Sequence, residues 1–229
     1  MCGIVGGIAQ RDVHPILIEG LRRLEYRGYD SAGVAVIGAS NELNRVRSLG
    51  KVQSLADRMG EKDMSGGLGI AHTRWATHGV PAENNAHPHI CNNRIAIVHN
   101  GIIENHEQLR VQQKELGFRF TSETDTEVIA HQIVHYLDDS DDLLQAVHRA
   151  IQDLEGAYAL AVISVESPDE LIVVREGSPL VLGLGIGENF LASDIQALLP
   201  VTSRVIYLEN GEFARLKRDS VELFDKNLN

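Results

Sequence analysis

The chain begins MCGIVGGI (residues 1–8), a stretch that places a cysteine directly before a run of small and apolar residues. Cys2 follows the initiator methionine, and its small side chain favours removal of that methionine. Cys2 would then hold both a thiol nucleophile and a free α-amine, whose usual pKa of about 7.7–8.0 suits it to accept a proton near neutral pH. The apolar residues 4–8 predict a strand that anchors this end. The simpler interpretation is an ordinary first strand, and the remaining sequence has to decide between the two.

Composition limits the class of protein. The chain has 229 residues, 43% hydrophobic and 23% charged, which is typical of one large soluble domain over residues 1–229. Its net charge of −11 disfavours nucleic acid or an anionic membrane as a partner. No run approaches the ~20 apolar residues of a membrane span, and the N-terminal stretch lacks the basic flank of a signal peptide. Two cysteines make no disulfide framework, so we expect a cytoplasmic location.

Hydrophobic periodicity predicts strands, then helices, then strands again. Helices are expected over residues 13–24, 52–59, 105–116, 124–137 and 143–154. Strands are expected over residues 4–8, 34–37, 43–49, 68–73, 95–98, 118–121, 157–165, 171–175, 180–184, 189–192, 205–208, 213–216 and 221–224. Residues 82–93 are polar and aperiodic, which favours a long functional loop. This order predicts an α+β domain in which helices cover two antiparallel sheets packed face to face.

Three motifs carry possible chemistry, each with a simpler alternative. Arg74 and Trp75 follow a predicted strand, where a guanidinium could hold a carboxylate and an indole could close over a ligand, or where both could simply occupy a surface loop. Asn100-Gly101 suits an oxyanion hole, although the same pair is common in turns. Asp125 could bind an ammonium group, although an acidic residue is also expected at a helix start.

Other patterns are weaker. A run of histidines invites a metal interpretation, but no cysteine or carboxylate completes a recognisable ligand spacing: His72, His78, His87, His89, His99 and His106. The GLGIG stretch (183–187) lacks the helix of a dinucleotide-binding loop, so a glycine-rich hairpin is expected. The basic cluster that includes Arg27 is most simply a solvated face. Cys91 has no evident role.

Taken together, five segments resemble one family: CGIVG (2–6), LEYRGYDSAG (24–33), HTRWATHG (72–79), HNGIIEN (99–105) and SETDTE (122–127). They closely resemble, in family order and over essentially the whole chain, the N-terminal glutaminase domains of the glutamine–fructose-6-phosphate aminotransferases (isomerizing), also called glucosamine-6-phosphate synthases. These are class II glutamine amidotransferases of the Ntn-hydrolase superfamily. The related amidophosphoribosyltransferases and asparagine synthetases differ where this chain reads EYRGY (25–29) and RWAT (74–77).

The resemblance implies a four-layer αββα sandwich and hydrolysis of L-glutamine through a γ-glutamyl thioester. By the same resemblance Cys2 is the nucleophile, and its amine is the base. Further roles follow for the other motifs: an oxyanion hole at Asn100 and Gly101, carboxylate binding at Arg74, ammonium binding at Asp125, a closing loop at Trp75, and lining of the site by Thr77 and His78. No metal or organic cofactor is implied.

The resemblance also implies two sugar-isomerase domains that bind fructose 6-phosphate, and these are absent from this chain. Glutamine hydrolysis is therefore expected here, and synthesis of glucosamine 6-phosphate is expected of the longer parent. We expect the parent to be a homodimer and the isolated domain to be a monomer or weak dimer. The alternative is a non-catalytic amino-acid-binding module on the same fold, against which the presence of Cys2 argues.

Overall fold

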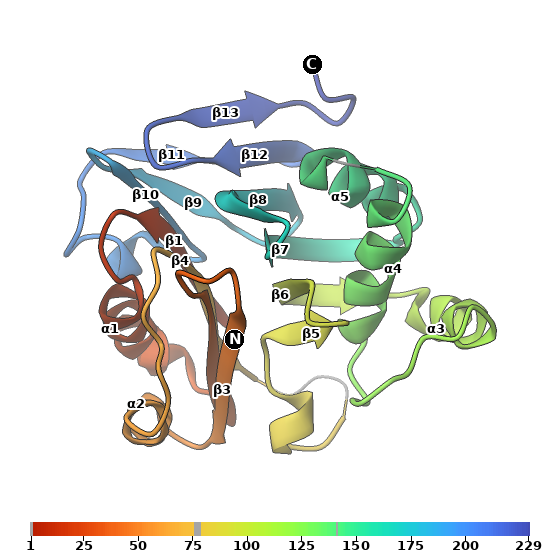
Figure 1. Cartoon of the computed structure of the whole chain (residues 1–229), viewed down its shortest axis with the longest axis horizontal. Helices are drawn as coiled ribbons and strands as arrows, with labels where there is room; N and C mark the ends of the chain where they lie inside the picture. Colours follow the sequence, from red (N-terminus) through yellow and green to blue (C-terminus); the bar gives the residue numbers. More distant parts are fainter. Residues whose placement is uncertain (1, 76–78, 141) are drawn as a thin grey trace.

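Two antiparallel sheets lie face to face between two layers of helices (Figure 1). The computed structural model describes residues 2–75, 79–140 and 142–229. The helices α1 and α2 cover one sheet, and α4 and α5 cover the other. This α, β, β, α order confirms the predicted α+β sandwich. No helix in the described ranges is long and apolar enough to cross a membrane.

The first sheet has seven strands in the order β11-β9-β10-β1-β4-β2-β3. Its strands are β1 (Gly3–Ala9), β2 (Ser31–Ile37), β3 (Leu43–Leu49), β4 (Leu68–Arg74), β9 (Val181–Leu184), β10 (Glu188–Ala192) and β11 (Val205–Tyr207). The first strand of the chain lies in the middle, hydrogen-bonded to β4 on one side and to β10 on the other. The N-terminal segment is therefore held from both sides and cannot fray as most termini do.

The second sheet has six strands in the order β13-β12-β8-β7-β6-β5. Its strands are β5 (His89–Cys91), β6 (Ile95–Ile103), β7 (Gly156–Ser164), β8 (Ser167–Glu176), β12 (Glu212–Leu216) and β13 (Val221–Phe224). The strand β6 does not end before Asn100, because the ladder with β7 continues through Asn100–Ala159 and Gly101–Tyr158. The turn interpretation of Asn100-Gly101 is therefore wrong.

The side chains of β1 alternate between two hydrophobic layers. Ile4 and Ile8 face the second sheet and belong to the cluster between the sheets, whereas Val5 and Ala9 face the helix layer. This two-residue period is what a strand buried on both faces requires. Burial of each isoleucine side chain contributes about 1.5–3 kcal/mol to folding, so the central strand is firmly fixed in register.

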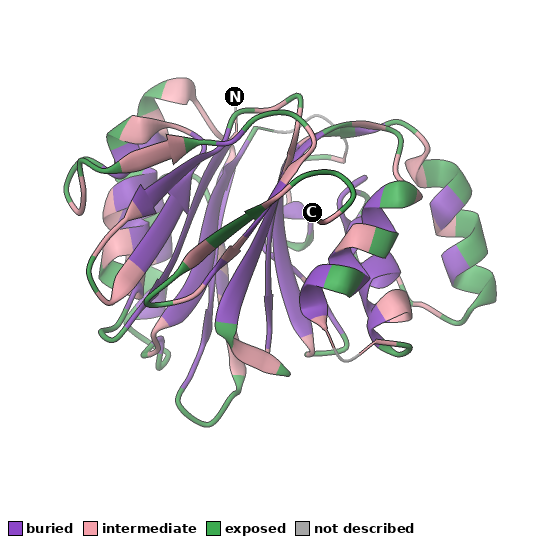
Figure 2. Ribbon diagram, turned by 90° about the horizontal axis from the view of Figure 1, so that it is seen from above, coloured by how far each residue is buried: buried purple, intermediate pink, exposed green. Residues whose placement is uncertain are grey.

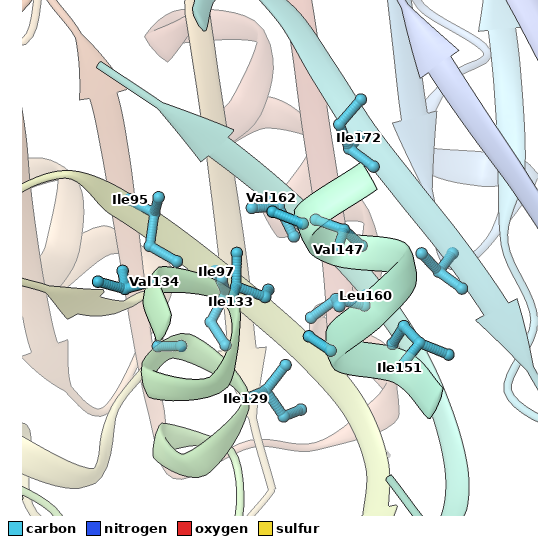
Figure 3. Packing of buried hydrophobic residues seen from close by; sticks show 14 of the residues in the cluster. Ile95, Ile97, Ile129, Ile133, Val134, Val147, Ile151, Leu160, Val162 and Ile172 are labelled. Atoms are coloured by element: carbon cyan, nitrogen blue, oxygen red, sulfur yellow. The ribbon is translucent and has the colours of Figure 1, made fainter. Parts of the chain in front are cut away.

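Most of the helices pack by one buried face and leave the opposite face to solvent (Figure 2), whereas α4 is buried on nearly all sides. Their bounds are α1 (His14–Leu24), α2 (Val52–Met59), α3 (His106–Glu115), α4 (Glu127–Leu137) and α5 (Leu143–Gln152). On the second sheet, branched side chains of α4 and α5 meet those of the strands (Figure 3): Ile129, Ile133, Val147, Ile151, Ile97, Leu160 and Val162.

Two local predictions are wrong. Residues 118–121 form no strand, because the alternation of Phe118 and Phe120 reflects packing of both rings on His131 of α4, at centroid distances of 4.9 and 4.6 Å. Within the predicted loop 82–93, the short strand β5 pairs with β6. Its side chains His89 and Cys91 are buried, but a strand of three residues that begins with a histidine is too short for a hydrophobicity pattern to reveal.

Candidate active site

Cys2 lies directly before β1, at the N-terminal end of the central strand of the first sheet. The register of β1 with β4 pairs Gly3 with Thr73, so Cys2 comes to lie beside the segment that follows β4. The Trp75 N–H donates to Cys2 Sγ at 3.2 Å, and the Trp75 carbonyl oxygen lies 3.5 Å from the same sulfur. Burial raises the pKa of the Cys2 thiol above its usual value, and the Trp75 N–H bond opposes that shift. The resting thiol is therefore protonated and needs a base to become a nucleophile.

Asn100 reaches the same place from the facing sheet. Its Nδ2 amide donates to the Cys2 carbonyl oxygen at 3.3 Å. Gly101 has φ of +139°, and a Cβ there would lie 1.9 Å from the Ala157 carbonyl oxygen of β7. Only glycine fits this backbone approach without displacing β7. The Asn-Gly pair is therefore fixed at its place by the ladder of β6 with β7.

A cavity of about 260 Å³ opens where the two sheet ends meet. It is lined by Cys2, Arg27, Trp75, Asn100, Gly101, Ile102, Ser178 and Pro179. The fold thus brings together four of the residues singled out from the sequence: Cys2 directly before β1, Trp75 directly after β4, and Asn100 and Gly101 in β6. Arg74 and Asp125 are not among the residues that line this cavity.

Arg74 is the last residue of β4 and is only 3% exposed. Its guanidinium donates to the carbonyl oxygens of Gly79 at 3.2 Å and Val80 at 3.4 Å, and lies 3.7 Å from an Asp30 carboxylate oxygen. The Asp30 N–H donates in turn to the Arg74 carbonyl oxygen at 2.8 Å. A buried guanidinium held in this way is a fixed positive charge near Cys2.

Asp125 does not cap α4. The helix begins at Glu127, and its N-cap residue Thr126 makes no side-chain capping bond. The Asp125 carboxylate, in a residue 4% exposed, instead accepts the Ile103 N–H of β6 at 2.9 Å. The capping-box prediction is therefore wrong, because the Glu127 carboxylate accepts from the backbone of Thr121 and Ser122. Asp125 is therefore held against Ile103, the last residue of β6, which lies two residues beyond Gly101.

Trp75 is 53% exposed, and its ring lies over Gly28, where an added Cβ would come within 2.5 Å of the indole. This contact gives the segment 24–33 a place in the site. Thr77 and His78 lie outside the described residues.

The sequence suggested that Arg27 lies on a solvated face, and this prediction is wrong. It lines the cavity, its Nη1 donates to the Cys2 carbonyl oxygen at 3.5 Å, and its Nη2 bonds Asp194 at 2.8 Å. The signal for this role was its position between small and polar residues that did not fit a core helix.

Four of the histidines that invited a metal interpretation are deeply buried in this region: His72, His87, His89 and His99. Burial lowers the pKa of His72 to about 3 and the pKa values of His87 and His89 well below their usual range. Hydroxyl partners lie within 3.1 Å of three of them, Thr126 for His87 and His99, and Thr124 for His89. In the described part of the chain, no three His, Cys, Asp or Glu side chains are arranged to hold a metal ion.

Comparison with known proteins finds similar proteins that carry the same name in different bacteria. The glutamine–fructose-6-phosphate aminotransferase (isomerizing) of Acinetobacter baylyi is 59% identical over 224 residues, which cover 98% of this chain and 36% of that protein. The protein of the same name from Escherichia coli K12 is 60% identical, with 99% of this chain and 37% of that protein covered. The chain thus spans little more than a third of the length of these curated relatives.

A solved structure agrees with this result. The glutamine phosphoribosylpyrophosphate amidotransferase of Bacillus subtilis superposes with a TM-score of 0.83 at 25% identity, over all of this chain and 50% of that chain. In addition, residues 72–200 match the family model described as a glutamine amidotransferase domain. With more than half of its length matched by this model, the chain belongs to the family of glutamine amidotransferase domains.

Proposed function

We propose that this chain hydrolyses the side-chain amide of L-glutamine, with Cys2 as the nucleophile. The observation that carries the proposal is the convergence of Cys2 and Asn100, from facing sheets, on one cavity with 3.3 Å between the Asn100 amide nitrogen and the Cys2 carbonyl oxygen. A thiol and an amide donor at the mouth of one pocket are the pair that acyl transfer needs.

The base is the α-amine of Cys2, freed when Met1 is removed. The thiol is protonated at rest, and this amine, with a usual pKa of about 7.7–8.0, takes its proton directly or through a water. The sulfur attacks the amide carbon, and the Asn100 amide and the Gly101 N–H stabilise the oxyanion that forms. The amide nitrogen leaves as ammonia with the transferred proton, and a γ-glutamyl thioester remains. Water then attacks the thioester, releases glutamate and restores the thiol.

The α-substituents of glutamine are recognised by opposite charges. We assign the α-carboxylate to Arg74, whose guanidinium is buried and held in place by backbone carbonyl oxygens. We assign the α-ammonium to Asp125, which is buried at the end of β6. Trp75 closes over the bound substrate, and the assignment of Thr77 and His78 to the lining rests on the family resemblance alone.

In a longer protein of the kind found among the relatives, we propose that the ammonia is passed to fructose 6-phosphate. The names of those relatives specify this acceptor, and the present chain covers 36–37% of them. Glucosamine 6-phosphate would be the product. A homodimeric parent and a monomeric or weakly dimeric isolated domain complete this proposal.

The test is release of glutamate and ammonia from L-glutamine by the purified chain, with the intact mass recorded to confirm that Met1 is absent. Cys2→Ala is compared with Cys91→Ala, because the second cysteine is buried and burial raises its pKa to about 12. We expect Cys2→Ala to lose at least about 1,000-fold in kcat and Cys91→Ala to stay within about threefold of the wild type. Turnover retained by Cys2→Ala would overturn the proposal. Glutamine binding without turnover by the wild type would leave an amino-acid-binding module.

A further inference from the structure

His72 belongs to β4 of the first sheet, and its side chain is fully buried between the two sheets. The ring faces the peptide that carries Asn100. Its Nε2 lies 3.0 Å from the His99 carbonyl oxygen and 2.9 Å from Asn100 Oδ1. The His72 ring also stacks on His87, with 4.2 Å between the ring centroids. One ring nitrogen of the first sheet therefore contacts two oxygens of the second.

These contacts determine which ring nitrogen carries hydrogen. A backbone carbonyl oxygen can only accept, so Nε2 must be the protonated nitrogen and must donate. Nδ1 of His72 has no hydrogen-bond partner within the described residues, which fits an unprotonated nitrogen. Because burial lowers the pKa of His72 to about 3, the ring gains no second proton under working conditions.

The same hydrogen determines the orientation of the Asn100 amide. An amide can turn its oxygen or its NH₂ group toward a neighbour, and only the oxygen can accept from Nε2–H. With Oδ1 engaged by His72, the NH₂ group points to Cys2, as its 3.3 Å contact with the Cys2 carbonyl oxygen requires.

We propose that His72 is a positioning residue that locks the Asn100 amide with its NH₂ group toward the Cys2 side of the cavity. The inference rests on the proposed glutaminase function, in which that NH₂ group stabilises the oxyanion. Without the His72 donor, the oxygens of His99 and Asn100 lose their shared partner. The amide is then no longer held by its oxygen, and an amide that turns would present that oxygen, instead of the NH₂ group, to the oxyanion.

The test compares His72→Gln with His72→Met. Glutamine places a donor nitrogen near the position of Nε2, whereas methionine has similar length and no donor. His89→Met serves as the control for loss of a buried imidazole, because His89 is equally buried but bonds Thr124 instead of Asn100. We expect His72→Met to lower kcat for glutamine about 10- to 100-fold with KM within about threefold, and His72→Gln to recover most of that loss.

A second readout separates loss of the oxyanion donor from damage to the nucleophile. Iodoacetamide alkylates Cys2 by forming a carbon–sulfur bond as iodide leaves with the bonding electrons and the thiol proton passes to solvent. No charge develops on a carbonyl oxygen in that step. The alkylation rate of Cys2 should therefore stay within about threefold of the wild type in His72→Met.

Four outcomes would overturn the inference: equal kcat losses in His72→Gln and His72→Met, an equal loss in His89→Met, an alkylation rate that falls with kcat, or a ¹⁵N spectrum that places the His72 proton on Nδ1. The ¹⁵N spectrum tests the tautomer without any assay of activity. A wild-type chain that releases no glutamate would instead refute the proposed function, so the two failures are distinguishable.

Discussion

Gly101→Ala tests whether the backbone of β6 requires glycine at the proposed oxyanion hole. Gly101 has φ of +139°, and a Cβ at this position would lie 1.9 Å from the Ala157 carbonyl oxygen. Ordinary contacts between carbon and a carbonyl oxygen are about 3.3–3.6 Å, so the two strands would have to separate by about 1.4 Å. That separation would break the ladder of β6 with β7 where it holds Asn100 and Gly101.

The expected loss of folding free energy in Gly101→Ala has two parts. The backbone conformation alone costs an alanine about 1–3 kcal/mol, and the forced contact adds about 1–3 kcal/mol, as overpacking does in cores. For a domain of this size each kcal/mol corresponds to a loss in Tm of about 2–4 °C. The variant should therefore unfold roughly 5–20 °C below the wild type and should lose glutaminase activity even where it stays folded.

Gly117→Ala is the matched control. Gly117 also has a positive φ, +91°, but nothing lies within 4 Å of an added Cβ. It carries the conformational cost without the contact, so thermal unfolding by circular dichroism should place its Tm above that of Gly101→Ala, with activity unchanged. Equal Tm losses in the two variants would refute the reasoning from the Ala157 contact.

Three further predictions concern charge and packing. His87 is buried and neutral, so between its lowered pKa and about pH 6.5 the unfolded chain binds more protons than the folded chain, and stability falls as pH falls. The free energy of unfolding, measured with urea at pH 6 and pH 5, should change with pH less steeply in His87→Gln than in the wild type, by about 1.4 kcal/mol per pH unit. An unchanged pH dependence would contradict this assignment. Asp125→Asn should raise KM for glutamine about 10- to 100-fold with little change in Tm, and should discriminate less than the wild type against the analogue without the α-amine, whereas unchanged discrimination would remove the ammonium assignment. Ile8→Ala, between the sheets, should cost about 2–5 kcal/mol in urea unfolding while the folded fraction keeps its activity, and a smaller loss would mean that the cavity collapses.

The helices and most strands could be predicted from the sequence because their signals are local. The alternation of Ile4, Val5 and Ile8 places β1 between two apolar layers, and a 3.6-residue period places α1 on the adjacent sheet. Cys2 could be singled out for a similar reason, since its chemistry depends on its place in the chain and on no distant partner.

The remaining features depend on pairing between distant segments. Asn100-Gly101 favours a turn locally, and only the register with β7 extends the strand through it. Asp125 fits a helix cap by spacing, yet its carboxylate accepts from Ile103, 22 residues away in the chain. In the sequence, Arg27 is only a polar residue that follows a helix. Its contact with Asp194, which follows β10, forms only in the folded chain. No local pattern contains these contacts.

The most direct test of the central claim is to trap the acyl intermediate. The chain is mixed with excess L-glutamine, quenched with acid during turnover, digested, and analysed by mass spectrometry. The proposed mechanism predicts a glutamyl adduct on the peptide that begins with Cys2, which hydroxylamine removes as it does a thioester. A glutamyl adduct on Cys91 or another residue, with Cys2 unmodified, would contradict it.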